Sequence, residues 1–183
     1  MQLTQGEIFM VIFEICNPVT GEVYSNVGGT VALPFGTEYG IKYSHYTDGR
    51  KVKLNISIDG KDVLEGNSLV IHPNTSGILK SFFSTGNAFK FIQMTDKIRN
   101  HRGERSSDGT ISIGYRYEKK PRVEQWTKCA KSMGCMDDTR STGFTTEGGK
   151  TDQKFTSVND FETETKIHRV SIELVGAQNA YTT

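Results

Sequence analysis

Alternating apolar and polar residues mark the strands of this chain. In residues 51–58 every second side chain is apolar, and residues 39–46 show the same pattern less regularly. A period of two is typical of a β-strand that buries one face. Asp48-Gly49 lies between the two segments, and this pair tolerates the positive φ of a tight turn. The pattern therefore predicts that the two strands pair as a hairpin.

Further short strands follow at intervals along the chain. Five segments are rich in β-branched and aromatic side chains, namely residues 69–72, 78–83, 89–94, 110–117 and 170–174. Two more turns are supplied by Asp59-Gly60 and Asp108-Gly109. No segment has the period of a helix of ten or more residues. We expect an all-β protein, an antiparallel β-sandwich of jelly-roll-like form with a long irregular insertion.

The strand pattern is not continuous along the chain. It is clearest from residue 38 onward, so we assign residues 38–183 to the sandwich and residues 1–37 to an N-terminal arm or extra strands. Within residues 119–166 the alternation fails and glycines become frequent. A loop of this length in a compact domain is typical of a lid, an arm or a segment that a partner orders. We expect the insertion to be the most variable element.

Charge and composition exclude several classes of partner. Twenty-two Lys and Arg residues against 21 Asp and Glu give a net charge of +1 in 183 residues, so no global field attracts nucleic acid or anionic lipid. The apolar run of residues 8–13 ends at Glu14, too short to cross a bilayer, and no export signal is evident. Three cysteines, an odd number, favour synthesis in a reducing cytoplasm over a disulfide framework.

Residues that could carry chemistry are scattered. Cys129 and Cys135 lie six apart without a second pair, so free thiols are a simpler interpretation than a metal site. The four histidines fall in separate segments without metal-ligand spacing, and no nucleophile or phosphate-loop motif is present. We therefore predict no catalytic residues, no metal and no cofactor.

Two stretches of opposite charge stand out. Residues 97–105 form the densest basic run, with Arg99, Arg102 and Arg105, and residues 160–164 form an acidic stretch. The basic run carries no interleaved aromatic residues, which argues against nucleic-acid binding and favours a solvated connection or ion pairing. Complementary patches suit assembly of subunits, and pairing within one chain explains them equally well.

Several blocks of the chain resemble a known family. These blocks are residues 38–42, 50–64 and 86–91, the Asp108-Gly109 turn with its following strand, residues 143–155, and the strand at 170–174. They are similar to a β-sandwich family of virion structural proteins from tailed phages and other large viruses. The resemblance implies a capsid decoration, a head-fibre base or a vertex component, with no catalytic residues to transfer.

From this resemblance we expect a non-enzymatic virion protein, made in the host cytoplasm. It would attach to the major capsid protein or other virion proteins, or form homo-oligomers. Large aromatic and arginine side chains contribute most to interfaces, so the candidate interface residues are Trp126, Phe144, Phe82, Phe83, Arg99, Arg102 and Arg105. For Phe82 and Phe83 an ordinary core position is the stronger interpretation. The alternative is a carbohydrate- or receptor-binding module on the particle exterior, in which Trp126 and tyrosines stack on sugars.

Overall fold

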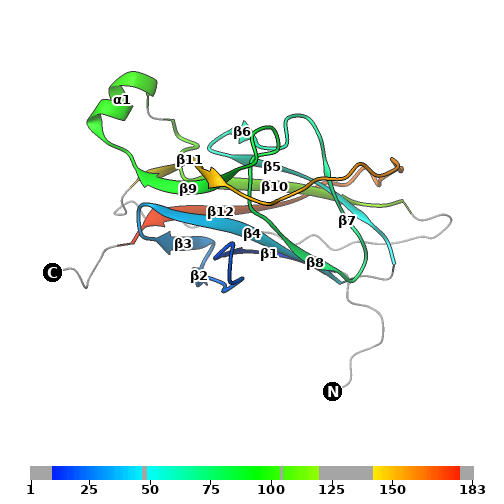
Figure 1. Ribbon diagram of the computed structural model, residues 1–183. Coiled ribbons are helices and arrows are strands. Elements are labelled where there is room, and N and C mark those ends of the chain that lie inside the picture. The colour runs from blue at the N-terminus through cyan, green and yellow to red at the C-terminus, as the bar shows by residue number, and fades with distance from the viewer. Residues whose placement is uncertain (1–9, 47–48, 104, 120–141, 178–183) are drawn as a thin grey trace, which may run out of the picture.

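The chain folds into two packed β-sheets with one short helix at an end (Figure 1). The computed structural model describes residues 10–46, 49–103, 105–119 and 142–177. The first sheet has the order β1-β4-β9-β11, with β8 also paired to β4. Its strands are β1 (Met10–Cys16), β4 (Thr37–Tyr46), β8 (Ser76–Leu79), β9 (Asn87–Gln93) and β11 (Gly143–Lys150).

The second sheet has the order β2-β3-β12-β10-β5-β6, with β7 also paired to β5. Its strands are β2 (Asn26–Val27), β3 (Thr30–Leu33), β5 (Val52–Ile58), β6 (Lys61–Asp62), β7 (Leu69–Ile71), β10 (Thr110–Tyr117) and β12 (His168–Gly176). Strands β3 and β12 run parallel, and the other strand pairs of the described residues are antiparallel. The predicted all-β sandwich is confirmed, with helix α1 (Asp96–Arg102) as its one helical addition among the described residues.

The predicted hairpin of residues 39–46 and 51–58 is wrong. Strand β4 pairs with β1, β8 and β9 in the first sheet, whereas β5 pairs with β10, β6 and β7 in the second. A turn from one sheet to the other uses the same residue types as a hairpin turn, so the turn signal does not separate the two cases. From β4 onward, the strands of seven or more residues alternate between the sheets, with β4, β9 and β11 in the first and β5, β10 and β12 in the second.

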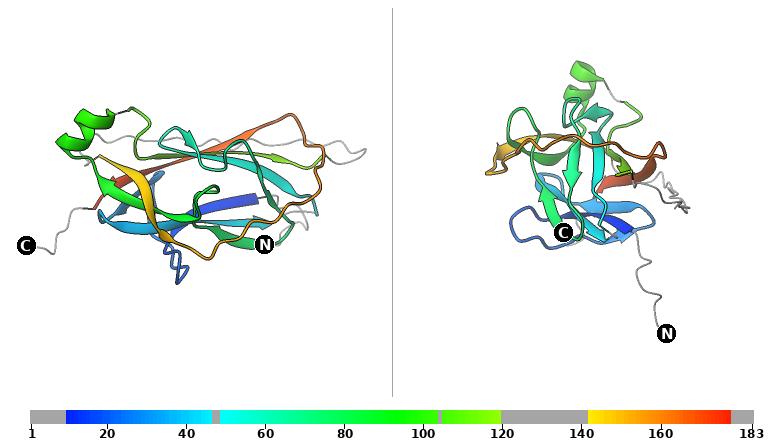
Figure 2. Two further views of the ribbon diagram at one scale, coloured as in Figure 1. Left: turned by 45° about the horizontal axis from the view of Figure 1, so that its top comes forward. Right: turned by 90° about the vertical axis from the view of Figure 1, so that its right-hand side faces the viewer.

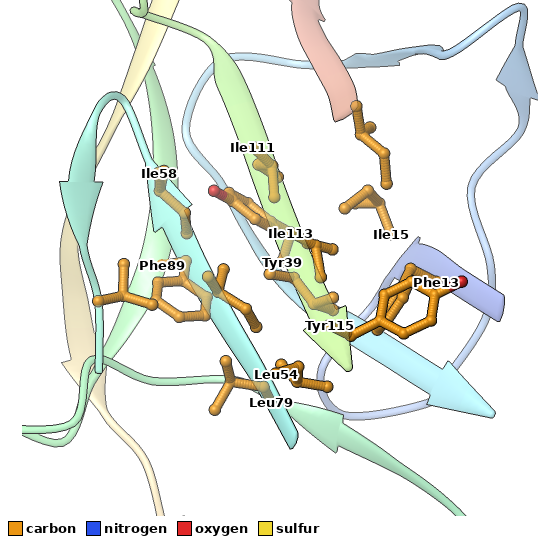
Figure 3. Close-up of a cluster of buried hydrophobic side chains, with 14 of the residues drawn as sticks. Phe13, Ile15, Tyr39, Leu54, Ile58, Leu79, Phe89, Ile111, Ile113 and Tyr115 are labelled. Carbon is orange, nitrogen blue, oxygen red and sulfur yellow. The ribbon is translucent and has the colours of Figure 1, made fainter. Parts of the chain in front are cut away.

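The apolar faces of the two sheets meet in one core. Figure 3 shows Tyr39 and Phe89 of the first sheet gathered with Leu54 and Ile111 of the second, and all four are buried. The alternation of the sequence dictates this arrangement: in β5 the buried residues are its first, third, fifth and seventh. Phe13 and Tyr115 join the sheets directly, with ring centroids 5.6 Å apart.

Two parts of the chain outside the expected strands also enter the sheets. Residues 10–37 supply β1, β2 and β3, so the N-terminal region contributes to both sheets. Within the expected irregular stretch of 119–166, Gly143–Lys150 forms the edge strand β11 beside β9. Only the first two residues of β11 are buried, and Gly149 N–H donates to a carboxylate oxygen of Glu38 at 2.9 Å. Because an edge strand buries so little, its sequence carries no alternation.

Residues 151–167, the crossing segment, connect the two sheets over the side of the sandwich (Figure 2). The Gln153 side chain holds the segment to the first sheet: its Oε1 accepts from Lys80 N at 2.6 Å, and its Nε2 donates to Ile78 O at 3.0 Å. The Phe155 ring lies 5.1 Å from that of Phe83. The acidic stretch lies within this segment and forms two ion pairs, Asp160 with Lys53 and Glu164 with Arg50. These two acids therefore pair within the chain and not with the basic run.

A partly buried histidine makes the stability of the sandwich depend on pH. His168 stacks on Tyr115 with 5.1 Å between centroids, and its buried Nε2 has no hydrogen-bond partner in the described part of the chain. Burial lowers the pKa of His168, and Lys166 and Arg50 lower it further against the opposing effect of Glu164. The folded state therefore binds fewer protons than the unfolded state, and its stability falls as the pH drops through the ordinary histidine range.

We predict that His168→Phe removes this contribution, because a phenyl ring keeps the stacking and does not titrate. The difference in melting temperature, variant minus wild type, should grow more positive as the pH is lowered from about 8 to about 5. Thermal denaturation followed by circular dichroism across this range measures it, with the exposed His72→Phe as the control. A difference that stays constant with pH would show that His168 does not titrate on unfolding.

Candidate interaction surface at the α1 end

Helix α1 stands out beyond the end of the two sheets (Figures 1 and 2). Thr95 is its N-cap, with Oγ1 accepting from Ile98 N at 3.2 Å, and Asp96 lies in the first turn, where the helix dipole favours an acid. Gly103 ends the helix at a φ of 89°, and its N–H donates to Arg99 O at 2.9 Å. No residue of this helix is buried, so packing alone does not hold it.

A buried ion pair anchors the helix to the sandwich. Arg102 Nη2 donates to Asp108 Oδ1 at 2.6 Å and Nη1 to Oδ2 at 3.2 Å, while Arg105 N donates to Oδ2 at 2.9 Å. The Asp108 side chain is fully buried, and that of Arg102 is 19% exposed. Burial opposes ionisation of Asp108, but the Arg102 guanidinium and the Arg105 N–H outweigh it, so the pKa of Asp108 lies below its usual value. The carboxylate therefore stays charged and the pair stays closed at neutral pH.

A second carboxylate, Asp59, joins the strand ends beneath this pair. Its Oδ1 accepts from Gly109 N at 2.8 Å and its Oδ2 from Thr145 N at 2.6 Å, which links β5, β10 and β11. Burial raises the pKa of Asp59 to about 6 against these two hydrogen bonds, and the charge of Asp108 raises it further. The two predicted Asp-Gly turns thus pack against each other. Gly109 has a φ of 84°, and a Cβ there would lie 3.0 Å from Leu174 O.

An apolar hollow of about 760 Å³ lies between α1 and the sheet edge. Ile92 of β9, Ile98 of α1 and Phe144 of β11 form its apolar wall, while Lys97 and Arg102 carry positive charge on its lining. The Arg102 guanidinium also lies 4.6 Å from the centroid of the Phe144 ring, a cation–π contact. An apolar centre with a charged border is the usual composition of a protein–protein interface.

The structure brings four of the candidate interface residues to this end. Phe144 and Arg102 line the hollow, Arg99 is on α1 and pairs with Asp96 at 2.7 Å, and Arg105 contributes its N–H to the anchor. The basic run, expected as a solvated connection, therefore contributes most of helix α1. The last arginine of this helix, Arg102, anchors it to the sandwich.

The other three candidates do not join this surface. Phe82 packs edge-on against Phe89 with 4.8 Å between centroids, and Phe83 lies against Phe155, so neither lines the hollow. Phe82 is half-buried against the core and Phe83 is 38% exposed. Trp126 lies outside the described residues.

The described residues contain no group of three or more His, Cys, Asp or Glu side chains placed to hold a metal ion. Cys16 is buried in the first sheet with a free thiol, and burial raises its pKa; Cys129 and Cys135 lie outside the described residues.

Asp59 and Asp108 are the buried carboxylates that sequence reasoning missed, because the sequence explains each of them as a turn residue. Their shared turn type and spacing gave no signal that the two turns would meet.

Comparisons with known proteins give no match: no family model, curated protein or solved structure is significantly similar to the chain. In the part of the chain that the structure describes, no helix is long and apolar enough to span a membrane. The function is therefore inferred from the geometry and from the sequence resemblance.

Proposed function

We propose that this protein is a non-enzymatic virion structural protein that attaches to the capsid shell or to neighbouring copies through the α1 end of its sandwich. The observation that carries the proposal is the apolar hollow under α1. Ile92 and Ile98, both half-buried, present apolar surface there beside the buried Phe144, and Lys97 and Arg102 border it. A partner that inserts an apolar side chain between acidic neighbours would complement this surface in both shape and charge.

The anchoring of α1 supports an attachment role. A seven-residue helix is too short to be stable alone, and this one is held by the Arg102–Asp108 pair. Binding to a surface that is already ordered costs less conformational entropy than binding to a flexible loop. The helix therefore presents Ile98 and its basic residues in a fixed arrangement, as a repeated contact on a particle would require.

The sequence resemblance supports the class of protein. The blocks that resemble virion β-sandwich proteins fall mostly on strands and turns of the two sheets, and the fold is a β-sandwich as that resemblance implies. Under this proposal the protein is made in the host cytoplasm and resides in the virion, with the major capsid protein, other virion proteins or further copies of itself as partners.

The test is incorporation into particles made from the genome that encodes the chain. Wild-type protein should be found by mass spectrometry in purified particles, at a copy number that matches a symmetry element of the capsid. Ile98→Asp places a charge in the apolar hollow and should reduce the incorporated amount about tenfold or more. Val19→Asp is the matched control, because Val19 is 89% exposed in a turn.

Both variants should fold, since neither side chain belongs to the core cluster. Absence of the wild-type protein from purified particles would overturn the virion assignment. Normal incorporation of Ile98→Asp would leave that assignment standing and exclude the α1 end as the attachment surface.

A further inference from the structure

The outer face of the second sheet carries polar side chains in register across three strands. Ser112 of β10 lies between Ser57 of β5 and Ser171 of β12, which places three hydroxyl groups in one row. In the next row Gly114 separates Asn55 from Arg169. These positions are the polar members of the alternation that builds the core on the opposite face.

The third row is formed by Lys53 and Arg116, which are directly opposed across β5 and β10. Like charges in this position destabilise a sheet. Arg116 and Arg169 have no ion pair or side-chain hydrogen bond with any described residue, and Lys53 pairs with Asp160. The face therefore holds three cations, of which two have no counter-charge in the described chain.

This face is hollowed into a groove of about 550 Å³. The loop after β6 borders it on one side, where Asn55 Nδ2 donates to Ser68 Oγ at 3.1 Å, and Thr163 and Ile167 of the crossing segment border it elsewhere. Gly114 has no side chain, and a Cβ there would be in van der Waals contact with the Ile167 side chain at 3.6 Å and with Arg169 Nη1 at 3.9 Å, so the glycine leaves room for both side chains at the middle of the groove. No Asp or Glu and no aromatic side chain is among its lining residues.

We propose that this groove binds an acidic oligosaccharide, with its carboxylate or sulfate groups on Arg116 and Arg169 and its hydroxyl groups along the serine row. Serine hydroxyls and the Asn55 amide both donate and accept hydrogen bonds, as sugar hydroxyls do. Arginine binds a carboxylate or sulfate through two parallel N–H groups. The anion would also relieve the repulsion between Lys53 and Arg116.

The lining favours a sugar over the other polyanions. Single-stranded nucleic acids rely on aromatic side chains for stacking of bases, and this groove offers none. An acidic peptide would use the cations but leave the row of three hydroxyls and the Asn55 amide largely unmatched. The inference is independent of the proposed attachment role, because no residue of the groove lines the hollow under α1.

The experiment titrates the purified protein with tetragalacturonate and with maltotetraose, an uncharged tetrasaccharide, by calorimetry and by NMR chemical shifts. We expect binding of the acidic sugar that weakens as salt is added, and no measurable binding of the neutral one. Arg169→Ser should weaken binding about tenfold by removing a bidentate contact. Lys150→Ser removes the same charge from an exposed position on β11, outside the groove, and should leave the affinity within about twofold.

A second variant separates hydroxyl recognition from general electrostatics. Ser112→Val keeps the charge, suits an exposed strand position and should still weaken binding about threefold or more. The proposal is overturned if tetragalacturonate does not bind the wild type, or if Lys150→Ser and Arg169→Ser weaken binding equally. It is also overturned if an oligothymidylate or an oligoaspartate of equal charge binds as tightly as the sugar.

Discussion

Replacing Asp108 by alanine is expected to lower the free energy of unfolding by about 2–3 kcal/mol and to release helix α1 from the sandwich. The Asp108 side chain is fully buried and accepts hydrogen bonds from Arg102 and from Arg105 N. Its loss leaves the guanidinium of Arg102, largely withdrawn from water, without its ion-pair partner. Urea denaturation measures the change in stability, and hydrogen exchange of the amides in α1 measures the release.

The matched control is Asp152→Ala. Asp152 pairs with Lys80 at 3.1 Å, but its side chain is 86% exposed. Solvent screens an exposed pair of this kind and leaves it little effect on stability, so the control should barely change the unfolding midpoint. Asp108→Asn keeps the shape of the side chain and part of its hydrogen bonding, so its loss should fall between the two. Equal losses for Asp108→Ala and Asp152→Ala would show that the buried pair does not anchor the helix.

Phe89→Ala is expected to have the largest effect on stability, a loss of about 3–5 kcal/mol. The Phe89 ring is fully buried between the sheets, 5.7 Å from the centroid of Tyr39 and 4.8 Å from that of Phe82. Truncation removes apolar burial and leaves a cavity that the surrounding strands can fill only in part. Chemical denaturation, or loss of soluble folded protein where the variant falls below the stability threshold, reports this effect.

Phe83→Ala provides the comparison, because Phe83 is 38% exposed and its ring packs against Phe155 of the crossing segment. Its loss should be about 1 kcal/mol. The prediction is contradicted if Phe83→Ala destabilises the protein as much as Phe89→Ala, since that would place Phe83 in the structural core.

The sequence predicted which side chains of a strand are buried better than it predicted which strands pair with each other. The alternation in β5 and β10 correctly separated Leu54 and Ile111, which are buried, from Ser57 and Ser112, which face outward. Alternation is a local property that a single strand displays. Which strands pair is decided by residues far apart in the chain, and for this reason the expected hairpin of residues 39–46 and 51–58 was not formed.

The candidate surfaces were predictable only in part. Residue type alone indicated four interface candidates that the structure places at the α1 end, namely Phe144, Arg99, Arg102 and Arg105. The hollow itself depends on Asp108 holding the helix in place through Arg102, a contact between a helix end and a turn that the sequence pattern does not reveal. The serine row likewise exists only once the registers of three strands are fixed.

The alternation of the long strands between the two sheets also has a consequence for how the chain folds. Strand β12 lies between β3 and β10 in the second sheet, and its partner β3 is more than a hundred residues away in sequence. Few strand pairs can form locally, so large loops must close before most contacts are gained, and such topologies fold slowly. On the ribosome, the second sheet stays incomplete until His168–Gly176 has emerged, so the sandwich completes its fold only after nearly the whole described chain has been made.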